Sequence, residues 1–131
     1  MPKTSRRLTV HPLTLRDVQV SRVVDLTSGM RRVTLVGDQL GAFTSGNGFP
    51  QPAFDSPGFD DDIRLVFCYP GQTAPVLPVQ KEKGLDIPRD PGPLSRVYTV
   101  RRWDAGTGEL DVDFVKHGVG AGTTWAYRAQ P

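Results

Sequence analysis

The stretch that decides the fold is RVYTVR at residues 96–101, followed one short hairpin later by DFVKHGVGAGTTW at residues 113–125. As a strand, the first stretch sends Arg96 and Tyr98 to one face, because side chains alternate with a period of two. The same alternation places Thr99 on the opposite face. Thr99 would therefore need a bulge, a strand end or its backbone amide to reach a ligand shared with Arg96 and Tyr98.

A β-hairpin is predicted around this stretch. Residues 104–108 (DAGTG) are typical of a turn, and the return strand over 109–115 carries Leu110, Val112 and Phe114 on one face. The hairpin brings the 96–99 stretch alongside Val115, Lys116 and His117.

Arg96 and Tyr98 together suit a ligand that carries both a phosphate and a flat ring. A guanidinium binds phosphate through two parallel hydrogen bonds, and a charged hydrogen bond of this kind contributes about 1.5–3 kcal/mol. A phenol packs along a ring system and keeps a polar edge, and Thr99 could donate to a ring nitrogen. On its own, the pair could equally be an exposed strand face with a solvated arginine.

A glycine-rich turn follows the hairpin, with Gly118, Gly120 and Gly122 spaced by two. Thr123 or Thr124 can cap a short helix over 123–129, and the amides at such an N-terminus suit a diphosphate. The spacing is not Gly-x-Gly-x-x-Gly and too little chain follows for a βαβ unit, so a Rossmann interpretation is rejected.

The combined pattern, Arg-x-Tyr-Thr-x-Arg, a hairpin, Phe-Val-x-His-Gly, a glycine-rich turn and a Trp, resembles the FAD-binding domain of siderophore-interacting proteins. These are ferric-siderophore reductases related to the ferredoxin reductase superfamily, and the resemblance extends from about residue 13 to 131. It implies an all-β fold, namely a single antiparallel β-barrel, closed or nearly closed, with a short C-terminal helix. The residues it implies for FAD binding are Arg96, Val97, Tyr98, Thr99, Val115, Lys116, His117, Gly118, Gly120, Ala121, Gly122, Thr123, Thr124 and Trp125.

The resemblance also implies partners. A following domain would bring NAD(P)H to the flavin, and this domain is absent from the chain; electrons would then pass to Fe(III) held by a siderophore. We expect residues 1–12 to be a flexible segment and residues 13–131 to form the flavin domain. Two alternatives stay open: a flavin-binding or electron-relay module that needs a partner reductase, and a non-catalytic interaction barrel.

Composition excludes several other classes. The chain has 131 residues, enough for one domain, and its 14 Gly and 12 Pro favour turns between strands. A net charge of +2 does not favour nucleic acid or an anionic membrane. Cys68 is the only cysteine, and neither a secretory signal nor a membrane-spanning run is visible, so we expect a cytoplasmic protein.

No motif for a metal, a nucleophile elbow or a phosphate-loop lysine appears. The carboxylates at 60–62 lack the spacing of a cation loop, so a solvated turn is favoured. His117 lacks partners for a metal site, and by resemblance the backbone around it faces the FAD diphosphate. Trp125 could stack on a ligand, although packing is favoured.

The rest of the chain predicts strands separated by two long loops. Residues 13–26 alternate with a slip in phase, which indicates one bent strand or two with a bulge. A turn at 27–30 and a strand over 31–36 complete a hairpin, and another strand precedes Cys68. Residues 41–58 and 68–94 are predicted as loops. Their phenylalanines either cover a bound ring or pack against the barrel, and packing is favoured: Phe43, Phe49, Phe54 and the nearby Phe59.

Overall fold

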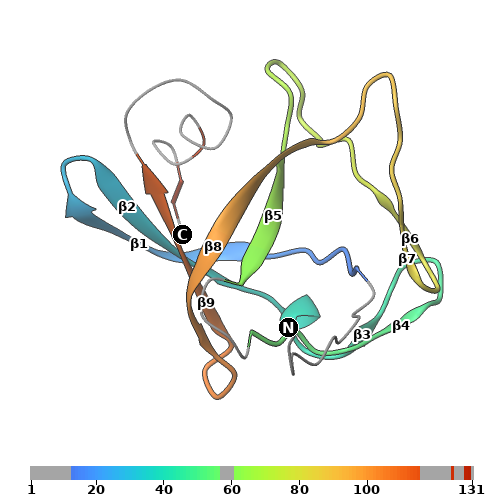
Figure 1. Ribbon diagram of the computed structural model, residues 1–131, viewed down its shortest axis with the longest axis horizontal. Helices are drawn as coiled ribbons and strands as arrows, with labels where there is room; N and C mark the ends of the chain where they lie inside the picture. Colours follow the sequence, from blue (N-terminus) through green and yellow to red (C-terminus); the bar gives the residue numbers. More distant parts are fainter. Residues whose placement is uncertain (1–12, 57–60, 116–124, 126–128, 131) are drawn as a thin grey trace, which may run out of the picture.

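The computed structural model describes residues 13–56, 61–115, 125, 129 and 130. The segment 1–12, expected to be flexible, lies outside the described residues. The fold is all-β as predicted (Figure 1). The elements in chain order are β1 (Gln19–Thr27), β2 (Met30–Val36), the 3-10 turn η1 (Asp38–Leu40), β3 (Phe43–Thr44), β4 (Pro50–Gln51), β5 (Asp62–Phe67), β6 (Val79–Lys81), β7 (Gly84–Asp86), β8 (Leu94–Asp104) and β9 (Glu109–Val115).

The main sheet has five antiparallel strands in the order β1-β2-β9-β8-β5. The β1–β2 hairpin closes with Thr27 opposite Met30, and the register of β1 shifts between Val20 and Arg22. β1 is thus one strand with an irregular register, and it begins at Gln19, later than the strand predicted from residue 13. The predicted β8–β9 hairpin is confirmed, and its turn ends at Gly108 with a φ of 72°.

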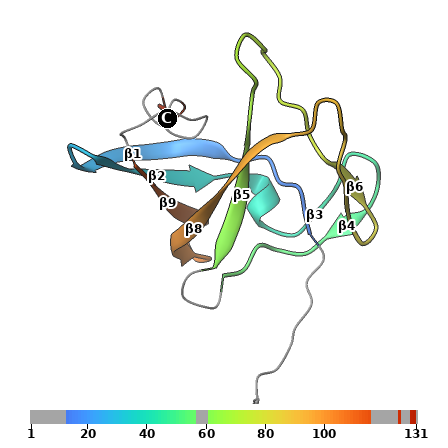
Figure 2. The same cartoon turned by 45° about the horizontal axis from the view of Figure 1, so that its top comes forward.

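Strand β8 pairs with two different strands along its length. Its first part pairs with β5, from Leu94 opposite Phe67 to Thr99 opposite Asp62, and its second part pairs with β9 from Val100 onward. The register shifts again between Val100 and Arg102, where the strand changes partner. Figure 2 shows the long, curved path of β8 between β9 and β5.

The core lies on one side of this sheet. Leu110, Val112 and Phe114 of β9 are buried, which confirms the face predicted from the sequence. Val33 and Leu35 of β2 pack beside them. Burying a side chain of this size stabilises the fold by about 1.5–3 kcal/mol.

The opposite side of the sheet carries ordered ion pairs. Asp111 is only 5% exposed, and its carboxylate accepts hydrogen bonds from the Thr34 hydroxyl (2.6 Å) and the Arg102 guanidinium (2.8 Å). Asp113 accepts from Arg32 at 2.8 Å in the same way. Each buried carboxylate therefore has the partners that burial requires.

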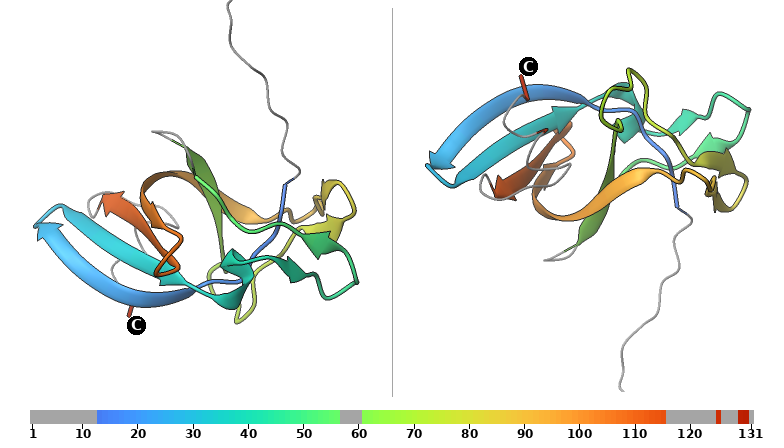
Figure 3. Two further views of the ribbon diagram at one scale, coloured as in Figure 1. Left: turned by 90° about the horizontal axis from the view of Figure 1, so that it is seen from below. Right: turned by 90° about the horizontal axis from the view of Figure 1, so that it is seen from above.

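The prediction of a closed barrel is wrong for the described part of the chain. The sheet ends at β1 and β5, and no backbone ladder joins these two edge strands there. The two small hairpins, β3–β4 and β6–β7, and the segment 13–18 lie at the other end of the molecule from the β1–β2 turn (Figures 1 and 3). Side-chain hydrogen bonds, rather than strand pairing, join the segment 13–18 to these two hairpins.

Gln80 is the central residue of that connection. Its side-chain carbonyl accepts from the Leu15 amide (2.8 Å), and its NH2 group donates to the carbonyls of Leu13 (3.2 Å) and Gly84 (3.0 Å). The Thr14 hydroxyl donates to the Gln51 side chain at 2.8 Å. The segment before β1 is thus bonded to both hairpins.

The two segments predicted as loops contain these hairpins, so the prediction of loops without regular elements is corrected. Strands of two or three residues are too short to show an alternating pattern in a sequence. Phe54 packs against Trp103, with ring centroids 5.0 Å apart, as the packing interpretation expected.

The helix predicted over 123–129 falls largely outside the described residues, and no C-terminal helix is among the elements described. In the described part of the chain, none of the helical segments has the length and hydropathy needed to cross a membrane.

Candidate functional site

Arg96 and Tyr98 lie on the same side of β8. Arg96 is opposite Leu65 and Tyr98 is opposite Ile63 in the β5 ladder. Ile63, Leu65 and Tyr98 all pack against the core cluster, so this is the inner side of the sheet. Burial raises the pKa of the Tyr98 phenol above its ordinary value, and the positive charge of nearby Arg96 opposes that rise in part.

The Tyr98 ring belongs to an aromatic cluster that we define as Phe67, Tyr98, Phe114 and Trp125. The centroid of Tyr98 lies 4.5 Å from that of Phe114 and 6.5 Å from that of Phe67. Trp125 lies 5.3 Å from Phe114 and 5.7 Å from Phe67. Sequence analysis missed Phe67 and Phe114 as neighbours of the site, although the alternation in β9 placed Phe114 on the inner face.

The Arg96 side chain is exposed, and its guanidinium donates a hydrogen bond to the carbonyl of Ser95 at 2.7 Å. Within the part of the chain that the structure describes, Arg96 forms no ion pair, unlike Arg22, Arg32 and Arg102. An exposed cation without a carboxylate partner can receive an anionic group at little cost in competing interactions.

Val97 and Thr99 point to the other side of β8. Val97 is 47% exposed and lies opposite Arg64, whose guanidinium donates to the Ser95 hydroxyl at 3.3 Å. The Thr99 hydroxyl donates to Asp62 at 3.4 Å. Strict alternation thus separates Thr99 from Arg96 and Tyr98, and the bulge that could have reversed it lies after Val100.

The end of β9 is described only as far as Val115, which pairs with Met30. The rest of the predicted diphosphate segment lies outside the described residues: Lys116, His117, Gly118, Gly120, Ala121, Gly122, Thr123 and Thr124. Trp125 is described, and its ring packs in the aromatic cluster, as the favoured packing interpretation stated.

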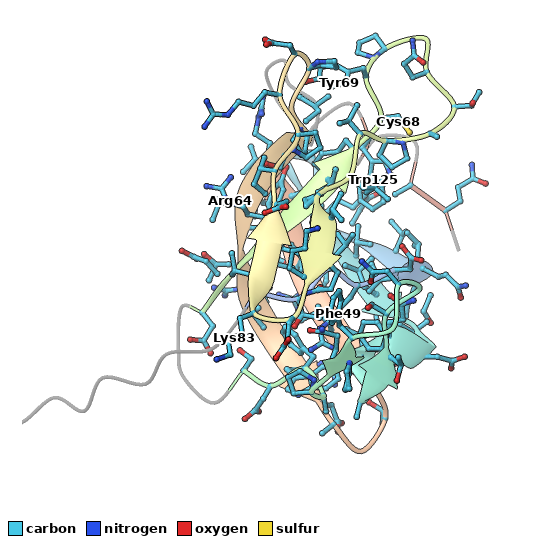
Figure 4. The ribbon with its side chains drawn as sticks, turned by 90° about the vertical axis from the view of Figure 1, so that its right-hand side faces the viewer. Phe49, Arg64, Cys68, Tyr69, Lys83 and Trp125 are labelled. Carbon is cyan, nitrogen blue, oxygen red and sulfur yellow. The ribbon has the colours of Figure 1, made fainter. Side chains whose placement is uncertain are left out.

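An apolar cavity of about 170 Å³ lies at the gap between β1 and β5. Figure 4 shows Trp125 near this gap, whereas Arg64 projects away from it. Sites for whole ligands usually measure about 300–1,000 Å³, so a dinucleotide would have to extend well beyond this cavity. It is lined by Val18, Val20, Leu35, Leu65, Val66, Phe67 and Trp125.

The described residues fit part of a flavin dinucleotide. Arg96 is a cation that could bind a phosphate, and Tyr98 is a half-buried phenol that could pack against a flat ring, on the same side of one strand. The described residues hold no cluster of three or more His, Cys, Asp or Glu side chains suited to a metal ion. Cys68 is an exposed free thiol.

Strand β8 of this all-β domain presents Arg96 and Tyr98 on one side, which is the arrangement expected from the resemblance to FAD-binding domains. The chain belongs to the family of siderophore-interacting FAD-binding domains, whose model matches residues 19–131.

Two curated relatives and two solved structures extend this assignment. The chain is 36% identical over 119 residues to the NADPH-dependent ferric-chelate reductase of Escherichia coli, covering 91% of the chain and 42% of that protein. It is 36% identical over 108 residues to the ferric vibriobactin reductase ViuB of Vibrio cholerae, covering 80% and 35%. The chain therefore spans less than half the length of both reductases.

The solved structures are similar in fold as well as in sequence. A siderophore utilization protein from T. fusca is similar with a TM-score of 0.72 and 37% identity, covering 87% of the chain and 40% of that protein. The siderophore-interacting protein SipS from Aeromonas hydrophila is similar with a TM-score of 0.62 and 26% identity, covering 87% and 38%.

Proposed function

We propose that residues 13–131 form the flavin-binding part of an NAD(P)H-dependent ferric-siderophore reductase. In this proposal Arg96 binds a phosphate of FAD and Tyr98 packs against its ring system. The relatives support this assignment, because two of them are named as ferric reductases and the chain matches 42% and 35% of their length. The nicotinamide-binding part would lie outside this chain, and we place the protein in the cytoplasm.

The single observation that carries the proposal is the position of Arg96 beside Tyr98. One is an exposed cation without an ion-pair partner among the described residues, and the other is a half-buried phenol two residues further along the same side. When bound, FAD would accept electrons from NAD(P)H and pass them singly to Fe(III) of the siderophore substrate. Arg96 would balance the phosphate charge, and the Tyr98 side would keep water from one face of the ring.

The remaining predicted site residues take supporting roles in this proposal. Backbone amides between Val115 and Trp125 would bind the diphosphate, because exposed amide groups suit its negative charge. Val97 and Thr99, on the other side of β8, would act through their backbone groups, since their side chains face away from Arg96 and Tyr98.

A flavin titration tests the proposal. We expect the 131-residue chain to quench the fluorescence of added FAD and to retain a yellow colour after desalting. Arg96→Ala should raise the Kd for FAD roughly 10- to 100-fold, because a charged hydrogen bond contributes about 1.5–3 kcal/mol. Arg64→Ala is the matched control, because Arg64 projects from the opposite side of the sheet and should leave the Kd unchanged.

Unchanged flavin fluorescence with the wild-type chain would contradict the proposal. A protein-interaction domain without a cofactor would also show no change in melting temperature with FAD, whereas a ligand at 100 times its Kd adds about 2.7 kcal/mol to the free energy of unfolding.

A second candidate is a flavin-binding or electron-relay module that works only with a partner reductase. Mixing the chain with FAD, NADPH and a ferric chelate tests this second candidate. Reduction only after a separate reductase is added supports the module, and iron reduction by NADPH without added protein contradicts it.

A further inference from the structure

Phe114 is the best-fixed member of the aromatic cluster. Its side chain is 1% exposed, and it lies at the inner face of β9, between Val112 of the core and the end of the strand. Two other members of the cluster, Phe67 and Trp125, both line the cavity of about 170 Å³ and so have free space on one side. Among the rings of the cluster, Phe114 is therefore the one whose own position is held by packing on all sides.

Among the rings that the structure describes, Phe114 is also the closest to Tyr98. The two centroids are 4.5 Å apart with an angle of 44° between the ring planes, whereas Phe67 lies 6.5 Å away with its plane at 81°. A tilted contact at this distance covers one face of the phenol and disfavours rotation of the ring about its Cβ–Cγ bond.

We propose that Phe114 is the positioning residue for Tyr98, and that it sets the plane in which the phenol meets the flavin ring. This inference rests on the proposed function. Ring-on-ring contact depends on the relative tilt and offset of the two planes, and a binding group is most effective when a packed neighbour locks its rotamer. A residue that touches no part of the ligand would then determine how well the ligand is held.

Two variants test the inference in the 131-residue chain. Phe114→Leu removes the ring and keeps an apolar side chain, and Leu110→Ala is the matched control. Leu110 lies four residues away on the same strand and the same buried face, is 2% exposed, and has no ring contact with Tyr98. Both variants lose core packing, but only Phe114→Leu removes the support of the phenol. Thermal unfolding followed by circular dichroism defines a temperature at which both are folded.

The first readout is the bound flavin. A stacking contact between Tyr98 and the flavin ring would contribute about 0.5–1.5 kcal/mol to binding, so its loss in Phe114→Leu should raise the Kd for FAD roughly 2- to 13-fold. The fluorescence of FAD at saturation should rise as the stacked geometry loosens. Leu110→Ala should match the wild-type chain in both measurements. Equal emission of bound FAD in Phe114→Leu and wild type, or an equal change in Leu110→Ala, would overturn the inference.

The second readout needs no flavin. The phenol of Tyr98 is shielded by the cluster and faces the charge of Arg96, so loss of Phe114 should let water reach it and lower the pH at which it ionises. Absorbance near 295 nm follows the three tyrosines, and subtraction of Tyr98→Phe isolates this one. An unchanged ionisation in Phe114→Leu would also overturn the inference.

The two readouts keep the inference separate from the proposed function. If the wild-type chain binds no FAD, the proposed function and the role toward flavin fail together, while the phenol titration still decides whether Phe114 holds Tyr98. If the wild-type chain binds FAD and the variant behaves like it, only the role of Phe114 fails. Should Phe114→Leu not fold, Phe114→Met takes its place, because methionine fills a similar volume without a ring.

Discussion

The side-chain carbonyl of Gln80 accepts a hydrogen bond from the backbone amide of Leu15 at 2.8 Å, although the two residues are 65 positions apart in the sequence. Gln80 is 6% exposed, and its NH2 group also bonds the carbonyl of Leu13. A single buried side chain thus satisfies both a donor and an acceptor of the segment before β1, where strand pairing does not.

Replacing this side chain should destabilise the protein. Gln80→Ala leaves the Leu15 amide and several carbonyls without partners, and a buried polar group left unsatisfied costs about 1–3 kcal/mol. Urea unfolding measures the loss, and hydrogen exchange at Leu15 should accelerate. Gln72→Ala, at an exposed position, is the control and should change neither. Equal exchange at Leu15 in the two variants would contradict the role of Gln80.

Asp111 should matter more for stability than Glu109, although both bind Arg102. Asp111→Ala removes the acceptor of the Thr34 hydroxyl, and the residue Thr34 is only 2% exposed. We therefore expect a loss of about 1–3 kcal/mol in the free energy of unfolding. Glu109→Ala should cost clearly less, because surface ion pairs are screened by water. Denaturation at equal ionic strength compares the two, and a larger effect of Glu109→Ala would refute the ranking.

The ion pairs of Glu109 predict a loss of stability in acid. The hydrogen bond from Arg22, and then that from Arg102, hold the pKa of the Glu109 carboxyl below its ordinary value of about 4.5. The stabilising effect is therefore complete above that ordinary value and is lost as the pH falls through the lowered pKa of the folded state. Melting temperatures between pH 7 and pH 3 should fall less steeply for Glu109→Gln than for wild type. Glu82→Gln, in the β6–β7 turn, should follow the wild-type curve.

Phe54 should be needed to keep Trp103 away from water. The rings meet edge to face at 5.0 Å, and the half-buried Phe54 contributes to the core cluster. Phe54→Ala should cost about 2 kcal/mol, less than the 3–5 kcal/mol typical of a fully buried phenylalanine. Tryptophan emission should shift to longer wavelength. Phe49→Ala, in the β3–β4 hairpin, should leave the emission unchanged, and an equal shift in both variants would argue against the Phe54 contact.

The parts of the fold that follow local patterns could be predicted from the sequence. Alternation over 109–115 identified the buried face of β9, and the DAGTG turn identified the β8–β9 hairpin. The small hairpins could not be predicted, because their strands are shorter than one clear repeat. The prediction of a closed barrel was wrong for a different reason. The segment before β1 is joined to the small hairpins by side chains such as Gln80, and no periodic pattern in the sequence marks such long-range contacts.

The site, too, could be predicted from the sequence only in part. A period of two was enough to place Arg96 and Tyr98 on one side of β8 and Thr99 on the other. The neighbours of Tyr98 come from β5 and β9, so Phe67 and Phe114 could be assigned to the site only from the packing of the sheet.

The junction between the segment before β1 and the small hairpins has a consequence for how this domain tolerates change. A continuous ladder resists substitution, because its bonds come from a backbone common to every residue. This junction depends on the side chains of Gln80, Thr14 and Arg16, the last of which donates to the carbonyl of Gly41 at 3.3 Å. Exchanging a few polar residues of this chain should therefore loosen or tighten this half of the molecule and leave the strand pairing around Arg96 and Tyr98 in place.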